Sequence, residues 1–267
     1  LIDDIQSQSW YRNPIGFGIA KVDRGQINKD KILQATFPLI NWNENFGSAA
    51  VLLNALKVAG VDVDTSKSEL VCKISDEFLT SCIEAFRPFI PEAKGDAHKN
   101  VQVISTLASL PIDSGLSADD YRVVFIFEDV TPESTEAVYL KLYALSTGKA
   151  ALRSLNLTGA FGKLHNCAWV GNQPIELDWL RANEIVLKLS GKYPNIDMVD
   201  KFPRFLQHII PADNTRILET SKVRMGAQLA AGTTVMPGAA YINFNAGTLG
   251  AVMVEGRISS SAVVGAG

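Results

Sequence analysis

Residues 217–241 read ILETSKVRMGAQLAAGTTVMPGAAY, and this stretch decides the fold expected for the last part of the chain. An apolar residue recurs at every sixth position, and a small residue follows four positions after each. The apolar series is Ile217, Val223, Leu229, Val235 and Tyr241, and the small series is Ser221, Ala227, Thr233 and Ala239. The lattice slips by one residue between 243 and 250, which predicts a loop or irregular corner. It resumes at Val252, Ile258 and Val264.

A period of six residues indicates a solenoid of triangular coils. Each hexad forms one short flat side, with the apolar residue pointing inward and the small residue at the corner. An ordinary antiparallel sheet with small residues is the alternative, but apolar residues in such a sheet rarely fall on a single six-residue spacing by chance. Coils have unpaired edges and need a cap, which the preceding region can supply. Residues 217–267 make fewer than three coils, and we expect the natural protein to continue past Gly267.

The residues before 211 mix strand and helix patterns, which predicts an α/β region in two segments, 1–110 and 111–210, before the solenoid segment 211–267. Strands are expected at 15–22, 69–74 and 121–127, and helices near 46–59, 133–145 and 175–190. Asn45 should cap the first helix, and Gly60 should end it. The second segment should begin after a loop at 111–120.

Composition narrows the class of protein. With 267 residues, 47% of them hydrophobic, the chain can bury a large core. A net charge of −3 gives no general attraction to nucleic acid or to an anionic membrane. Three widely spaced cysteines indicate reduced packing residues, and neither a signal peptide nor a membrane-spanning run is found. We therefore expect a cytoplasmic protein that acts on small molecules.

Glu255 is the main candidate for chemistry in the solenoid segment. No histidine lies beyond His208, so this segment offers no imidazole for a zinc site or a general base. Glu255 is the only acidic residue after Glu219, and it precedes Arg257 by two positions. It either pairs with Arg257 for structural reasons or acts in catalysis or ligand binding. Burial would raise the Glu255 pKa and a close Arg257 would lower it.

Four further polar residues have two possible roles each. Asn243 and Asn245 can bind a polar substrate or close a turn on their own backbone. Lys222 and Arg224 can be solvated surface residues or clamps for an anion. We list Asn243, Asn245 and Arg257 as candidate binding residues for substrate or CoA.

Several motifs resemble those of one enzyme family. They are EAVYLKL at 136–142, NLTG at 156–159, NCAW at 166–169, VDKFP at 199–203, VRMGA at 223–227, GTTVM at 232–236, NFNAGTLG at 243–250 and MVEGRIS at 253–259. Together they resemble tetrahydrodipicolinate N-succinyltransferases of the second, actinobacterial and pseudomonad-like type. The similarity covers residues 133–267, and residues 1–110 are less distinctive.

The resemblance implies a homotrimer of left-handed parallel β-helices with active sites between subunits. It implies succinyl transfer from succinyl-CoA, a co-substrate, to the nitrogen of tetrahydrodipicolinate in diaminopimelate and lysine biosynthesis. The family's Glu-Gly-Arg motif makes Glu255 the catalytic residue and Arg257 a contact for succinyl-CoA. Glu255 could form an acyl anhydride or act as general base. The second is favoured because a carboxylate is a weak nucleophile.

One departure from the family concerns a metal. Some members bind magnesium through an aspartate before the Val-Arg segment and a glutamate after Thr-Val-Met. Here those places hold Ser221 and the stretch 237–240, which has no carboxylate and is one residue longer. We therefore expect no metal and no bound cofactor. Two rival functions stay open: another hexapeptide-repeat acyltransferase with a different acceptor, and a non-catalytic solenoid scaffold.

Overall fold

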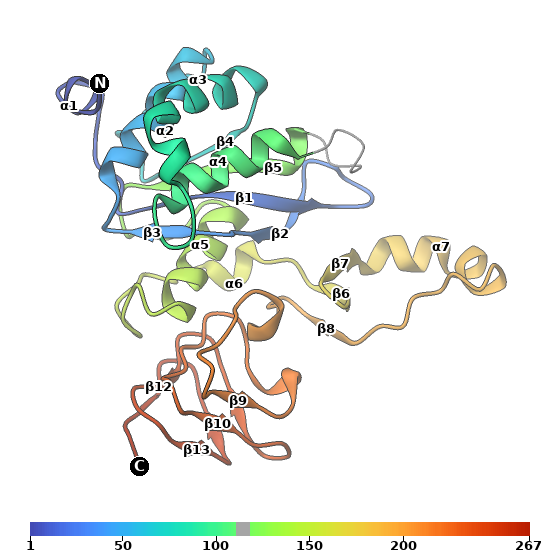
Figure 1. The fold of residues 1–267 in the computed structure, drawn as a ribbon. Coiled ribbons are helices and arrows are strands. Elements are labelled where there is room, and N and C mark those ends of the chain that lie inside the picture. The colour runs from blue at the N-terminus through green and yellow to red at the C-terminus, as the bar shows by residue number, and fades with distance from the viewer. Residues whose placement is uncertain (111–117) are drawn as a thin grey trace. The chain divides into compact units, whose positions relative to one another are not determined.

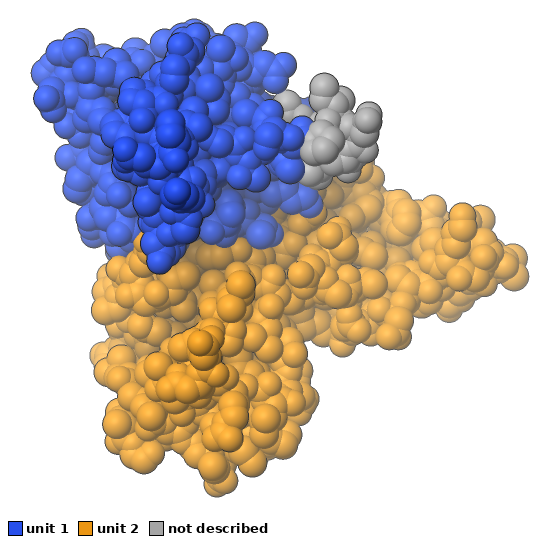
Figure 2. Space-filling view, viewed as in Figure 1, with its two compact units in different colours: residues 1–22, 35–140 blue, residues 23–34, 141–267 orange. Residues whose placement is uncertain are grey.

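The computed structural model describes residues 1–110 and 118–267, so the first seven residues of the predicted loop at 111–120 lie outside the described part. The chain forms two compact units, shown in separate colours in Figure 2. Unit 1 comprises residues 1–22 and 35–140, and unit 2 comprises residues 23–34 and 141–267. The predicted segments 1–110, 111–210 and 211–267 divide the chain at other positions and remain a prediction about domains.

An antiparallel sheet with helices makes up unit 1, except that the end of the first strand and the start of the second, within residues 23–34, belong to unit 2. The strands are β1 (Gly16–Arg24), β2 (Ile32–Thr36), β3 (Ile40–Trp42), β4 (Glu69–Lys73) and β5 (Tyr121–Ile126). Their order is β2-β1-β5-β4, and β3 also pairs with β1. The helices are α1 (Ile2–Gln6), α2 (Phe46–Val58), α3 (Asp76–Phe86) and α4 (Lys99–Ser109), with 3-10 turns at Arg87–Glu92 and Ala118–Asp120. Apolar residues of β1, β5, α2 and α3 share one core. The predicted strands and the first helix are confirmed in type.

The start of α2 differs from the expected cap. Asn45 does precede the helix, but its φ of 55° is left-handed and its side chain makes no capping hydrogen bond. Its Nδ2 donates instead to Asn41 Oδ1 at 2.7 Å. The other end is as predicted, because Gly60 has a φ of 79° and donates its N–H to Lys57 O.

Three helices and a small sheet precede the coils. Helix α5 (Thr135–Ser146) and helix α7 (Leu177–Leu189) match two predicted helices, and α6 (Ala160–Lys163) is a single turn. Strands β6 (Cys167–Val170), β7 (Gln173–Glu176) and β8 (Met198–Asp200) form an antiparallel sheet in the order β7-β6-β8. Pro174 lies in β7, and α7 follows directly after this strand. The apolar residues of α7 are not all buried, since Leu180 is buried while Val186 is 67% exposed.

The last part of unit 2 is a stack of parallel coils (Figure 1). Strands β9 (Arg216–Ile217), β10 (Thr234–Val235) and β13 (Met253–Val254) pair in parallel, as do β11 (Tyr241–Ile242) with β14 (Arg257–Ile258), and β12 (Gly247–Thr248) with β15 (Val263–Val264). Parallel bridges Val223↔Ile242 and Gln228↔Gly247 extend the last two columns into the first coil. An α/β region followed by stacked β coils is therefore confirmed.

The lattice is displaced at two positions. In the second coil Ile242 is fully buried and Tyr241 is not, and in the third coil Val254 is buried while Val252 is only partly so. The extra residue lies in the corner at 236–241, since Ile242 follows Val235 by seven positions where Val223 follows Ile217 by six. The slip predicted at 243–250 was therefore placed too late, because two adjacent apolar residues hid which one points inward.

One corner of every coil uses the same backbone conformation. Gly226, Asn245 and Ser261 have φ values of 90°, 54° and 65°. Asn245 N donates to Gly226 O at 2.8 Å, and Ser261 N donates to Asn245 O at 3.0 Å. Left-handed residues turn the chain sharply between two sides, which favours glycine and asparagine.

Candidate functional site

Glu255 lies on the tight corner between β13 and β14. Val254 and Ile258 are both buried although only four positions separate them, so the residues between them turn outward. Glu255 is exposed, and the described structure gives it no hydrogen bond or ion pair. The pairing with Arg257 that the sequence left open is therefore not formed. Glu255 is a carboxylate presented to solvent.

Arg257 begins β14 and lies next to Tyr241 in the parallel register. Its guanidinium carbon is 5.9 Å from the centroid of the Tyr241 ring, within the range of a cation–π contact. Arg257 is exposed, and no carboxylate pairs with it in the described part of the chain. Its fork of N–H groups is available to a carboxylate or phosphate.

Arg224 projects from the same side of the coils, two coils before Arg257, but its charge is compensated. Its Nε and Nη2 donate to the two carboxylate oxygens of Asp200, both at 3.1 Å, and its Nη1 donates to Asn243 Oδ1 at 3.2 Å. Asp200 also pairs with Arg204 at 2.8 Å. Arg224 is thus a structural residue rather than an anion clamp.

Lys222 is also engaged within the chain. Its Nζ donates to Gly238 O at 2.8 Å and lies 3.5 Å from a carboxylate oxygen of Glu219. The hydroxyl of Ser221 donates to the same carboxylate. Of the three cations considered on this side of the coils, only Arg257 has no carboxylate beside it in the described structure.

The two asparagines have structural contacts, and none of the described contacts joins them to Glu255. Asn243 Oδ1 accepts the N–H of Phe244 at 2.9 Å in addition to Arg224, so it closes a turn on its own backbone. Asn245 Oδ1 accepts the N–H of Arg153 at 2.8 Å, and its Nδ2 lies 3.4 Å from Ser261 Oγ. Their assignment to substrate or CoA binding remains a prediction.

Two residues on this side of the coils have roles that the sequence did not predict. Tyr241 was assigned to the inward lattice, whereas its ring lies outside next to two guanidinium groups. Asp200 was noted only within the VDKFP motif, and it holds Arg204 and Arg224. A tyrosine in a series of aliphatic residues was the signal that could have marked Tyr241 as outward-facing.

The expected metal positions hold no carboxylate in this structure. Ser221 and the stretch 237–240 occupy them, and the Lys222 ammonium binds the carbonyl of Gly238 within that stretch. Among the described residues there is no group of three or more histidine, cysteine, aspartate or glutamate side chains placed to hold a metal ion. The absence of a metal in the protein stays a prediction.

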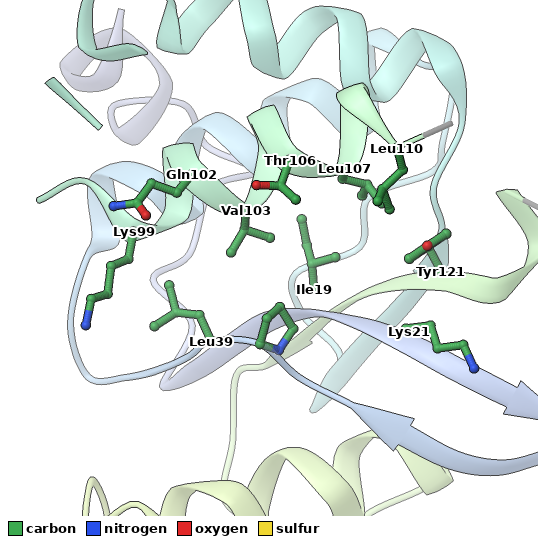
Figure 3. Close-up of a pocket in the computed structure, with 11 residues that line it drawn as sticks. Ile19, Lys21, Leu39, Lys99, Gln102, Val103, Thr106, Leu107, Leu110 and Tyr121 are labelled. Carbon is green, nitrogen blue, oxygen red and sulfur yellow. The ribbon is translucent and has the colours of Figure 1, made fainter. Parts of the chain in front are cut away.

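A cavity of about 430 Å³ lies in unit 1 (Figure 3). Its walls are mainly apolar residues of β1, α4 and the loop at 38–39, including Ile19, Leu39, Val103 and Leu107, with Lys99 at one end and Tyr121 at the other. It could hold a small apolar molecule. None of the predicted site residues lines it, so it is not the candidate for acyl transfer.

The comparisons with known proteins identify the family of the chain. A family model described as the N-terminal part of tetrahydrodipicolinate N-succinyltransferase matches residues 1–162, and a model of the middle part matches residues 164–204. The chain belongs to the tetrahydrodipicolinate N-succinyltransferase family. The similarity therefore includes the N-terminal residues, which the motifs had left indistinct.

Relatives with the same family name are similar to this chain over its whole length. A 2,3,4,5-tetrahydropyridine-2,6-dicarboxylate N-succinyltransferase from Sulfurovum is 67% identical over 267 residues, which is 100% of this chain and 66% of that protein. One from Nitratiruptor is 66% identical over 100% of this chain and 67% of its own length. A crystal structure of a putative 2,3,4,5-tetrahydropyridine-2-carboxylate N-succinyltransferase from Campylobacter jejuni superposes with a TM-score of 0.94 at 56% identity. It is matched over 68% of its length, and this chain over 100%.

The chain thus spans about two thirds of the length of these succinyltransferases. The likeness supports an N-terminal domain followed by a β-helix. Within the described residues, no helix is both long and apolar enough to cross a membrane.

Proposed function

We propose that the protein transfers the succinyl group of succinyl-CoA to the nitrogen of tetrahydrodipicolinate, a step of diaminopimelate and lysine biosynthesis. Family membership supports the reaction, and one structural observation supports its location. The corner at 255–257 presents a carboxylate and a guanidinium that have no charged partner in the described structure. The other two cations on this side of the coils are engaged by Asp200, Glu219 and Gly238.

In this proposal Arg257 binds succinyl-CoA through a carboxylate or phosphate group. A planar guanidinium can form two parallel hydrogen bonds to either anion, which fixes the thioester relative to the corner. Arg257 and Glu255 lie on the same turn, separated by Gly256. If the bound group is the carboxylate of the succinyl moiety, the thioester of the same moiety lies near the Glu255 carboxylate.

Glu255 acts as a general base. Once water has added across the carbon–nitrogen double bond of the cyclic acceptor, its nitrogen carries a hydrogen and attacks the thioester carbonyl carbon. The nitrogen's proton passes to Glu255, the carbon–sulfur bond breaks, and the departing CoA thiolate takes up that proton. The alternative is attack by Glu255 itself, which gives an acyl anhydride that the acceptor nitrogen then opens. Attack by the acceptor nitrogen is favoured over attack by Glu255. A carboxylate is a weak nucleophile, and positioning of the two substrates requires no high-energy acyl anhydride.

The finer structural expectations belong to the same proposal. We propose that the coils are left-handed and that three copies assemble with active sites between neighbouring subunits. An exposed corner with free charged groups suits a site that a second subunit completes. We also propose a cytoplasmic location, which agrees with three free, buried cysteines.

The test is a thioester-cleavage assay on the intact protein with tetrahydrodipicolinate. Succinyl-CoA should be the preferred donor, and Glu255→Gln should lower kcat by a factor of about 10² to 10⁴, the usual contribution of a general base. Glu219→Gln is the matched control, because Glu219 is also exposed on a coil but is paired with Lys222. Full activity of Glu255→Gln, or a preference for acetyl-CoA, would refute the proposal.

A further inference from the structure

The Tyr241 ring lies between two guanidinium groups on the outer surface of the coils. The guanidinium carbons of Arg224 and Arg257 are each 5.9 Å from its centroid. The arrangement follows from the register, because Tyr241 pairs with Arg257 across β11 and β14. Since Val223 pairs with Ile242, Arg224 stands diagonally opposite Tyr241 on the other neighbouring strand.

The two guanidinium groups differ in their hydrogen bonds and in whether a carboxylate compensates their charge. Arg224 donates from three nitrogens to Asp200 and Asn243, so it is fixed and its charge is compensated. Arg224 also lies 5.3 Å from the Phe202 ring centroid. The Tyr241 ring is therefore backed by an immobile group on one side. On its other side the ring faces Arg257, an exposed side chain with no charged partner in the described structure.

An exposed arginine samples many rotamers, and that freedom is lost when it binds an anion. An aromatic ring that contacts the guanidinium reduces the number of arginine rotamers before the anion binds. The N–H groups along the edge of the guanidinium plane stay free to bind the anion. We infer that Tyr241 is a positioning residue that holds Arg257 ready to bind succinyl-CoA. This inference rests on the proposed function, in which Arg257 contacts that substrate.

The contact is made by the aromatic ring rather than by the hydroxyl. No hydrogen bond of the Tyr241 hydroxyl is found in the part of the chain that the structure describes. Tyr241→Phe should therefore behave as the unchanged protein does. Tyr241→Leu keeps an apolar side chain in the strand but removes the quadrupole that attracts the cation.

The experiment is steady-state kinetics on the intact protein with succinyl-CoA as the varied substrate. Tyr241→Leu should raise KM for succinyl-CoA about 2- to 5-fold with kcat nearly unchanged, the size expected for an exposed cation–π contact and the pattern of lost ground-state binding. Tyr241→Phe should restore the original KM. In an Arg257→Ala background, Tyr241→Leu should have no further effect, because the group it positions is gone.

Several outcomes would overturn the inference. An unchanged KM in Tyr241→Leu, equal defects in the Leu and Phe variants, or additive effects with Arg257→Ala would each do so. Thermal unfolding of each variant guards against a loss of fold, and Tyr241→Gln repeats the comparison if the Leu variant is unstable. An unchanged protein without succinyl transfer, or an Arg257→Ala variant with a normal KM, would instead refute the proposed function on which the inference rests.

Discussion

Unit 2 uses polar side chains in two contrasting ways. Just before the coils and at the corner of the second coil, Asp200, His208 and Asn245 each have polar atoms engaged by neighbours in the chain. At the corner of the third coil, Glu255 and Arg257 are exposed and have no charged partner in the described residues. The difference suggests that polar groups with a hydrogen-bond or ion-pair partner within the chain hold the coils in place, while polar groups without such a partner are left for a ligand. Stability and activity should therefore respond to different residues.

Asp200→Asn should give the largest loss of stability. The Asp200 carboxylate is mostly buried and binds Arg204 at 2.8 Å and Arg224 at 2.9 Å. Removing its charge leaves two arginines uncompensated, which should cost about 3 to 5 kcal/mol of unfolding free energy. Denaturant unfolding followed by tryptophan fluorescence can measure this, since Trp169 Nε1 donates to Asp200 O at 2.9 Å.

The matched control for Asp200 is Asp178→Asn in α7. Asp178 pairs with Arg181 at 2.6 Å, but both side chains are mostly exposed, so the loss should be a small fraction of that for Asp200. If both variants lost the same unfolding free energy, a buried carboxylate paired with two arginines would contribute no more to stability than an exposed one.

His208 should make unit 2 less stable in acid. Its Nδ1 lies 2.7 Å from the Tyr143 hydroxyl and its Nε2 lies 2.9 Å from Gln34 Oε1. Gln34 Nε2 donates to Asp23, so Gln34 Oε1 faces the ring as an acceptor and His208 Nε2 carries the hydrogen. Burial of the ring lowers the His208 pKa from 6.5 to about 4.

The sign of this pH effect follows from the lowered pKa. Between pH 6.5 and pH 4 the unfolded chain binds a proton at His208 that the folded chain does not. Stability is therefore complete above pH 6.5 and falls toward pH 4, by at most roughly 3 kcal/mol. Denaturant unfolding at several pH values should show this slope, and His208→Gln should reduce it. An unchanged slope in that variant would assign the acid sensitivity to other groups.

Asn245→Ala should destabilise the coils by about 2 kcal/mol. Alanine disfavours the left-handed conformation by about 1 kcal/mol or more, and the hydrogen bond to Arg153 N adds about 1 kcal/mol. Asn245→Gly is the control, because glycine accepts the backbone angles and loses only the side-chain contacts. Thermal unfolding should rank the variants as Asn, Gly, Ala in decreasing stability. An Ala variant as stable as the Gly variant would show that the backbone conformation matters little.

Much of the fold could be predicted because it depends on local periodicity. The six-residue lattice indicated the coils, and strands in unit 1 followed from runs of apolar residues such as Tyr121–Ile126. The helix α5 and its end near Gly148 also followed from local signals. What the pattern could not resolve was a choice between adjacent apolar residues. Tyr241 and Ile242 are both apolar enough to point inward, and only packing in three dimensions decides between them.

The candidate site was predictable in identity but not in its contacts. Glu255 stood out as a lone carboxylate, but its position on a tight corner follows from the burial of Val254 instead of Val252, which the lattice did not predict. The partners of Arg224 could not be foreseen, since Asp200 lies 24 positions earlier and meets it only through the fold. Asn245 was ambiguous for the same reason, because its role depends on the backbone of the neighbouring coils.

The smallest stability effect is expected at the residue with the largest expected effect on activity. Glu255→Gln removes no hydrogen bond or ion pair found in the described structure, and the side chain is exposed. Its melting temperature should therefore stay within about 2 °C of the unchanged protein, the range of ordinary surface substitutions. A drop as large as that of Asn245→Ala would mean that Glu255 has a structural partner, and the contrast between the two corners would fail.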